Sequence, residues 1–369
     1  MTLIFPQHET DITDEPGLHA LVIGVGAYPH LEGGSGPRAA KTFDLGQLQS
    51  PVPSARRIAK WLLDEYRNQQ TPLRSLEVLL SPPAVPPEVE IERASMANIE
   101  DAFIRWDQRC SRNPENIAFF YFCGHGLSTS TQFLLPDDFG DPLRRRWKNC
   151  IDFDDTVVQM RVCRARTQLY FLDACSNRPT AEREDPSGGR LKDGEGRLAP
   201  AVPAFGSYSA ASEGRQAFAP NETPDGVTYF AQALLDCLRG AGVDPKGRKW
   251  FVTLNGLGSH LKKVMDRLGR LNGRTLTPVI VTSGDTDLHE VDRPFVMSLV
   301  DCRTKAARYG SEMSMSSGSD IRRSQRGDKR PWLEEVPPGQ WRFEVTYAVQ
   351  TDSWDWPLSP PCYDYEVDF

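Results

Sequence analysis

The sequence of 369 residues has no apolar run approaching the roughly 18 residues that a membrane-spanning helix needs. It has no excess of basic residues either, because 43 lysines and arginines stand against 50 aspartates and glutamates. A nucleic-acid-binding domain usually carries the opposite balance. Residues 1–10 lack the basic and apolar stretches of a secretion signal. We therefore exclude a membrane anchor and nucleic acid as partners, and we expect a cytoplasmic protein.

Zinc-type cysteine pairs and a complete dinucleotide loop are also missing. The eight cysteines are scattered, and none forms the C-x₂₋₄-C spacing of a zinc site. Without a secretion signal we expect free thiols in a reducing compartment. Gly24 and Gly26 begin a glycine-rich pattern, but Pro29 occupies the position of its third glycine. We therefore predict no metal and no cofactor, and a nucleotide-binding protein is disfavoured.

Short apolar runs alternate with amphipathic stretches over most of the chain. This alternation predicts an α/β fold with a mostly parallel sheet flanked by helices in three layers. From about residue 293 the pattern changes to period two, which is typical of antiparallel strands with one wet face. We expect a first domain over residues 1–292 and a small all-β module over residues 293–369. The expected strands are 19–27, 75–80, the runs before His125 and Cys175, 133–136 and 277–281, and the expected helices are 53–66, 98–109, 152–162, 225–239 and 252–268.

Two apolar runs stop at a reactive side chain, one at His125 and the other at Cys175. If the runs are neighbouring parallel strands, both residues lie at the carboxyl edge of the sheet, where such folds bind ligands. A thiol attacks a carbonyl only as thiolate, and a neighbouring imidazole assists its ionisation. We predict Cys175 as nucleophile and His125 as general base and acid, with the backbone N–H groups of Gly126 and Cys175 as an oxyanion hole. Cys123 is the competing nucleophile, although we expect it deeper in the sheet.

With the 50 residues that separate His125 from Cys175, these motifs resemble the caspase-like clan of cysteine peptidases. The resemblance covers roughly residues 17–290 and includes caspases, metacaspases and bacterial caspase-family and CHAT proteins. The Asp-x-Cys ending at Cys175 is nearer to metacaspases than to animal caspases. Where metacaspases tend to carry Asn-Asp-Ala, this chain has Pro53-Ser54-Ala55, so one acidic group of that pocket is absent. Some metacaspases need calcium, and for this chain that requirement stays open.

Asp173 lies two residues before Cys175, on the same side of the expected strand. A carboxylate there favours a cationic side chain in the substrate, so we expect cleavage after Arg or Lys, with an acidic P1 residue as the alternative. The resemblance points the same way, because the matching aspartate lines the S1 pocket of metacaspases. In the competing interpretation Asp173 only orients a loop or a helix. Asp137 and Asp138 follow the strand after His125, where they would either reinforce the negative field of the site or, as we mainly expect, lie in a solvated turn.

Residues 178–200 are rich in glycine and charged residues, which predicts an exposed, mobile loop. The resemblance places the loop where cleavage between a large and a small subunit commonly activates these enzymes. If P1 is basic, the candidate cleavage sites are Arg178, Arg183, Arg190, Lys192 and Arg197.

The favoured hypothesis is a caspase-like endopeptidase that acts on protein substrates in a bacterial stress or antiviral pathway. An upstream protease or sensor protein would activate its precursor. The alternative is a catalytically silent scaffold that binds partners, and labelling of the active-site thiol would distinguish the two.

Overall fold

The computed structural model describes residues 2–82, 91–128, 131–143, 146–175, 189, 191, 204–210, 226–294, 296–300, 312–323, 332–347 and 350–359. The chain forms two compact units. One consists of residues 1–232 with 276–286, and the other of residues 233–275 with 287–369.

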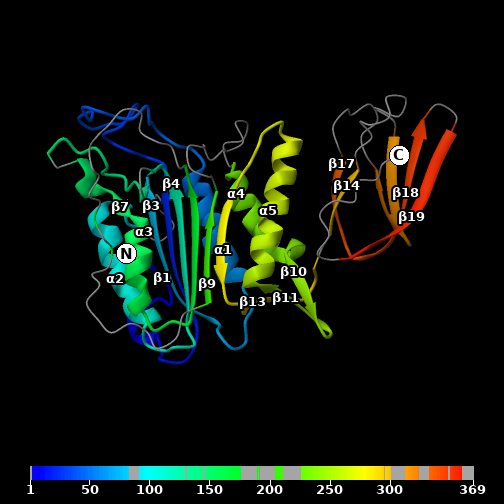
Figure 1. Cartoon of the computed structure of the whole chain (residues 1–369), viewed down its shortest axis with the longest axis horizontal. Helices are drawn as coiled ribbons and strands as arrows, with labels where there is room; N and C mark the ends of the chain where they lie inside the picture. Colours follow the sequence, from blue (N-terminus) through cyan, green and yellow to red (C-terminus); the bar gives the residue numbers. More distant parts are fainter. Residues whose placement is uncertain are drawn as a thin grey trace. The chain divides into compact units, whose positions relative to one another are not determined.

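The first unit is built on a seven-stranded sheet with the strand order β1-β3-β2-β4-β8-β9-β12 (Figure 1). The inner strands are parallel to one another, whereas β1 and β12 run antiparallel at the two edges. This arrangement confirms the predicted mostly parallel α/β sheet. The strands are β1 (Leu3–Phe5), β2 (Leu18–Val25), β3 (Leu73–Ser81), β4 (Ile117–Gly124), β8 (Thr167–Ala174), β9 (Ala204–Ser209) and β12 (Val279–Ser283).

Helices flank both faces of this sheet, as predicted. Every residue of β4 is buried, because its side chains alternate between two covered faces. Phe120 and Phe122 share a core with α2 (Met96–Cys110) and α3 (Phe153–Gln159). Cys123 instead contacts Ser54 of α1 (Pro51–Asp64) on the other face. Ser95 caps α2, and its hydroxyl accepts from the Asn98 N–H.

A small antiparallel sheet begins immediately after His125. It consists of β5 (Gly126–Ser128), β6 (Gln132–Leu134) and β7 (Ile151–Asp152). Gly189 extends it, because the Gly189 N–H donates to the Cys150 carbonyl at 2.8 Å and the Gly189 carbonyl accepts from the Asp152 N–H at 3.0 Å.

Leu191 is buried, with 4% of its surface exposed, in the core formed with α2 and α3. We call Gly189 and Leu191 the anchor. The exposure predicted for residues 178–200 is therefore wrong for Leu191. The five candidate cleavage sites in this segment lie outside the described residues.

The second unit combines a helix with small antiparallel sheets. Residues 233–275 and 287–291 include α5 (Leu254–Leu271) and a sheet of β10 (Val243–Lys246), β11 (Lys249–Thr253) and β13 (Asp287–Val291). Ahead of it, α4 (Tyr229–Asp236) continues into a π-helical turn, Cys237–Ala241. Among the described residues, no helix is both long and apolar enough to span a bilayer.

The predicted small antiparallel sheets at the carboxyl end are confirmed. One has the order β16-β15-β18-β19 and the other pairs β14 with β17. Their core includes Met315, Trp341 and Phe343. Residues 362–369 of the expected all-β module lie outside the described residues. The strands are β14 (Val296–Val300), β15 (Glu312–Ser317), β16 (Asp320–Arg323), β17 (Trp332–Val336), β18 (Gly339–Tyr347) and β19 (Gln350–Leu358).

Candidate active site

The register of β4 and β8 brings the two predicted reactive residues to one edge of the sheet. The last residues of these parallel strands, Gly124 and Ala174, lie opposite each other. His125 and Cys175 directly follow them, so both leave the sheet at its carboxyl edge. An imidazole and a thiol therefore emerge from neighbouring strands at the same level.

Cys175 differs from the other cysteines that the structure describes. It is partly exposed, whereas Cys110, Cys123, Cys150, Cys163 and Cys237 are buried. Burial, followed by the nearby Asp173 carboxylate, raises the pKa of Cys123 well above its usual value. A thiol that stays protonated is a poor nucleophile. Of the two competing thiols, Cys175 is thus the one suited to attack.

The His125 imidazole is held through one of its two nitrogens. Its Nε2 lies 2.8 Å from the Gly46 carbonyl oxygen. A carbonyl only accepts hydrogen bonds, so Nε2 carries the proton and Nδ1 is left as the proton acceptor. Burial lowers the pKa of His125, and the bond to Gly46 partly opposes this effect. At neutral pH the imidazole is therefore uncharged and able to take a proton.

Tyr28 supports the backbone of His125, a role that the sequence analysis missed. Its hydroxyl accepts from the His125 N–H at 2.8 Å and donates to the Leu135 carbonyl at 3.2 Å. Its ring lies 4.8 Å from the imidazole ring, centroid to centroid. The available signal was an aromatic residue just beyond the first buried strand, at the edge that carries the site.

Gly126 packs directly against the backbone of Cys175. A Cβ atom at Gly126 would lie 2.4 Å from the Cys175 carbonyl oxygen, closer than real contacts allow. Only glycine permits this approach. The structure thus brings together the two residues whose N–H groups were predicted to form an oxyanion hole.

Asp173 is almost fully buried, with 2% of its surface exposed. Its Oδ2 accepts from the hydroxyls of Tyr121 and Thr228, whereas its Oδ1 is buried without a hydrogen-bond partner among the described residues. Burial raises the pKa of Asp173 to about 6, against the effect of these hydroxyls. The Cys123 thiol also interacts with this carboxylate, so three side chains surround it.

Thr228 and Ser54 complete this buried polar cluster. The Thr228 hydroxyl accepts from the Ala231 N–H at the start of α4, and the Thr228 N–H donates to the Ser54 hydroxyl at 3.0 Å. Asp173 thus contacts Thr228, the residue immediately before α4. Such a contact is expected if Asp173 orients a helix, which is the competing interpretation of its role. Ser54 occupies the position where the resemblance led us to expect an acidic residue.

Asp137 does not lie in the predicted solvated turn. It is buried, and both of its oxygens accept from the Arg93 guanidinium, at 2.8 and 2.9 Å. Its charge is therefore neutralised rather than added to the field around Cys175. No three histidine, cysteine or acidic side chains within the described part of the chain gather as a metal site would require.

The chain is similar to a group of known proteins. A family model described as "Caspase domain" matches residues 18–288. The uncharacterized protein y4kE of Sinorhizobium fredii is 31% identical over 276 residues, 70% of this chain and 78% of that protein. A probable protease from a Desulfuromonadales bacterium is 27% identical over 231 residues, 60% of this chain but 26% of that protein. The solved structure of pro-Sf-caspase-1 aligns with a TM-score of 0.40 and 11% identity, over 73% of this chain and 93% of that one.

Proposed function

Because the chain belongs to the caspase-domain family of peptidases, we propose that it is a cysteine endopeptidase with Cys175 as nucleophile and His125 as general base and acid. The observation that carries this proposal is the bond between His125 Nε2 and the Gly46 carbonyl. It leaves Nδ1 as the basic nitrogen of the residue that follows β4, while Cys175, the one partly exposed cysteine among those described, follows the neighbouring strand β8.

The chemistry proceeds in two stages. In the first, Nδ1 of His125 takes the Cys175 proton, and the thiolate attacks the scissile carbonyl carbon. The resulting oxyanion accepts from the N–H groups of Gly126 and Cys175. When the C–N bond breaks, the imidazolium returns its proton to the leaving amine and an acyl thioester remains. In the second stage His125 deprotonates a water molecule, which hydrolyses the thioester and regenerates the thiol.

We propose that the substrate residue before the cleaved bond is Arg or Lys. The unpartnered Oδ1 of Asp173 supports this specificity, because a guanidinium or ammonium group would supply the missing donor and a positive charge. Preference for an acidic residue is the alternative, in which Asp173 serves only the hydroxyls of Tyr121 and Thr228.

We further propose that the chain is made as a precursor and activated by cleavage within residues 178–200. Replacing Arg178, Arg183, Arg190, Lys192 and Arg197 together by Gln should prevent processing, because no basic residue of the segment remains for cleavage. Intact mass spectrometry before and after activation checks this expectation. The matched control replaces the five acidic residues Glu182, Glu184, Asp185, Asp193 and Glu195 by their amides and should be processed normally. A basic-to-Gln variant that becomes fully active without a cut would refute processing as the switch.

We also propose a role in a bacterial stress or antiviral response, in the cytoplasm and downstream of a sensor or another protease; the two relatives named above come from bacteria. A phage should form fewer plaques on a lawn of cells that carry the wild-type gene than on a lawn of cells that carry the Cys175→Ala variant. Equal plaque counts, with both proteins present at the same level, would remove the antiviral part of the proposal.

A further inference from the structure

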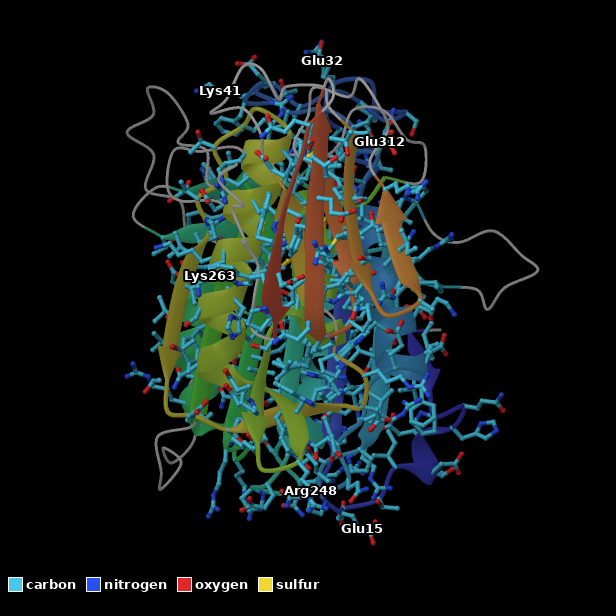
Figure 2. The ribbon with its side chains drawn as sticks, turned by 90° about the vertical axis from the view of Figure 1, so that its right-hand side faces the viewer. Glu15, Glu32, Lys41, Arg248, Lys263 and Glu312 are labelled. Atoms are coloured by element: carbon cyan, nitrogen blue, oxygen red, sulfur yellow. The ribbon has the colours of Figure 1, made fainter. Side chains whose placement is uncertain are left out.

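The loop that follows β2 is closed by the side chain of Gln47. Its Oε1 accepts from the Tyr28 N–H at 2.8 Å, and its Nε2 donates to the Tyr28 carbonyl at 2.9 Å. The same Nε2 also donates to the Glu32 carbonyl at 3.0 Å. Figure 2 shows Glu32 and Lys41, both from this loop, at the opposite end of the first unit from Glu15, which precedes β2. We call the three bonds the Gln47 clamp.

The two residues that hydrogen-bond to His125, Gly46 and Tyr28, both lie at this clamp. Gly46, adjacent to Gln47, accepts from His125 Nε2, and Tyr28, which Gln47 binds through its backbone, accepts from the His125 N–H. The imidazole and the backbone of His125 are thus held from two sides by one closed loop.

The loop backbone needs such a constraint. Phe43 and Asp44, just before Gly46, have φ angles of 55° and 57°, a region that costs residues with a side chain about 1 kcal/mol or more. Strained conformations persist only where the surroundings over-determine them. The Phe43 ring lies near those of Phe139 and Trp147, and backbone bonds join the Glu32 N–H to the Leu45 carbonyl and the Leu48 N–H to the Gly26 carbonyl. The side chain of Gln47 adds three further bonds at the residue next to Gly46.

We propose that Gln47 is a positioning residue for His125. Its amide holds the Gly46 carbonyl against Nε2 and so keeps the imidazole in the Nε2–H tautomer, with Nδ1 free for the thiol proton. The kinetic part of this inference rests on the proposed peptidase function, whereas the tautomer does not.

An amide is needed because the clamp uses an acceptor and a donor at once. Gln47→Glu keeps the acceptor for the Tyr28 N–H and loses both donated bonds, whereas Gln47→Ala loses all three. Gln47 itself is exposed, so neither change empties the core or costs much stability.

The matched control is Asn113→Ala. Asn113 also clamps a loop, since its Nδ2 donates to the Asp14 carbonyl at 3.0 Å and its Oδ1 accepts from the Glu115 N–H at 2.9 Å. It precedes the amino end of β4, at the opposite edge of the sheet from His125.

The test combines kinetics on a cleaved peptide with ¹⁵N NMR of the histidine rings, the His125 signals being assigned from their loss in His125→Gln. Gln47→Ala should lower kcat by about 10- to 100-fold, the scale on which small displacements of catalytic groups act, with KM changed less than about threefold. The His125 spectrum should shift from Nε2–H towards a mixture of tautomers. Gln47→Glu should fall between wild type and Gln47→Ala, and Asn113→Ala should match wild type in both measurements.

A wild-type kcat and an unchanged His125 spectrum in Gln47→Ala would overturn the proposal, as would equal losses in Asn113→Ala. If Gln47→Ala fails to fold, Gln47→Glu decides by the same two measurements. If the wild-type chain, once processed within residues 178–200, cleaves no peptide, the proposed function fails, and the tautomer spectrum alone still decides the role of Gln47.

Discussion

Cys175→Ala is expected to abolish peptide hydrolysis and thiol labelling while the protein stays folded. Without the sulfur no thioester can form, so we expect kcat to fall by about 10⁴-fold or more, as it does when other proteases lose their nucleophile. The side chain is only partly buried, so the free energy of unfolding should change by less than about 1 kcal/mol. Peptide-library turnover, labelling with iodoacetamide and thermal melting give the three readouts.

Cys123→Ala is the matched control for this experiment. The Cys123 thiol is buried and its pKa is raised, so the variant should keep both labelling at Cys175 and turnover. His125→Ala should lose turnover almost as fully as Cys175→Ala. Activity that survives in Cys175→Ala, or labelling at Cys123 alone, would contradict the assignment. A folded wild-type chain that neither turns over peptides nor labels after processing within residues 178–200 would instead favour the silent scaffold.

Asp173→Asn should change activity and stability in opposite directions. Burial raises the pKa of Asp173 to about 6. Keeping this carboxylate ionised in the folded chain therefore lowers the free energy of unfolding, and the full loss applies above that pH. Asparagine keeps an acceptor for Tyr121 and Thr228 but carries no charge. At pH 8 the variant should therefore gain on the order of 2 to 3 kcal/mol in unfolding free energy, while cleavage after Arg or Lys is largely lost.

The direction of the stability change follows from the raised pKa of Asp173. A raised carboxyl pKa in the folded state means that the cost is absent below about pH 4, grows between pH 4 and 6, and is complete above pH 6. The stability difference between wild type and Asp173→Asn should vanish near pH 4. In the wild type, turnover of Arg and Lys peptides should fall as the pH drops through about 6, because a protonated Asp173 no longer attracts a cation. Denaturant unfolding and kcat/KM across this range check both statements.

Asp137→Asn is the control for Asp173→Asn, because Asp137 is buried to the same degree but paired with Arg93. It should destabilise the fold at pH 8 and leave the choice of substrate unchanged. A preference of the wild type for acidic residues at P1, or undiminished cleavage after Arg in Asp173→Asn, would remove Asp173 from the specificity pocket.

The parallel sheet could be predicted from sequence because β2, β4 and β8 are buried on both faces and therefore consist of unbroken apolar runs. The same runs placed His125 and Cys175 at one edge, since each run ends where its reactive residue begins. β15 and β16 could not be found in this way. They are short and rich in serine and arginine, and only Met313 and Met315 face their core.

The supports of His125 lie beyond what a sequence pattern can indicate. Tyr28 and His125 are 97 residues apart, and Gly46 contributes only a carbonyl oxygen that every residue possesses. Leu191 is one of two leucines in a charged segment, so composition predicts exposure for it. Its burial depends on a hydrophobic pocket that exists only after α2 and α3 have packed on the sheet.

The anchor, Gly189 and Leu191, lies within the segment between β8 and β9. A cut before the anchor therefore has a different consequence from a cut after it. A cut before Gly189 leaves the anchor on the carboxyl-terminal fragment, still paired with β7 and inserted into the core of the amino-terminal fragment. The two fragments then share a second contact in addition to the β8–β9 pairing, and their dissociation is slower. A cut after Leu191 leaves the anchor within the amino-terminal fragment, and only the first unit's sheet and helix contacts join the halves. If the chain is processed as proposed, we expect the side of the cut to set the lifetime of the complex between the two fragments.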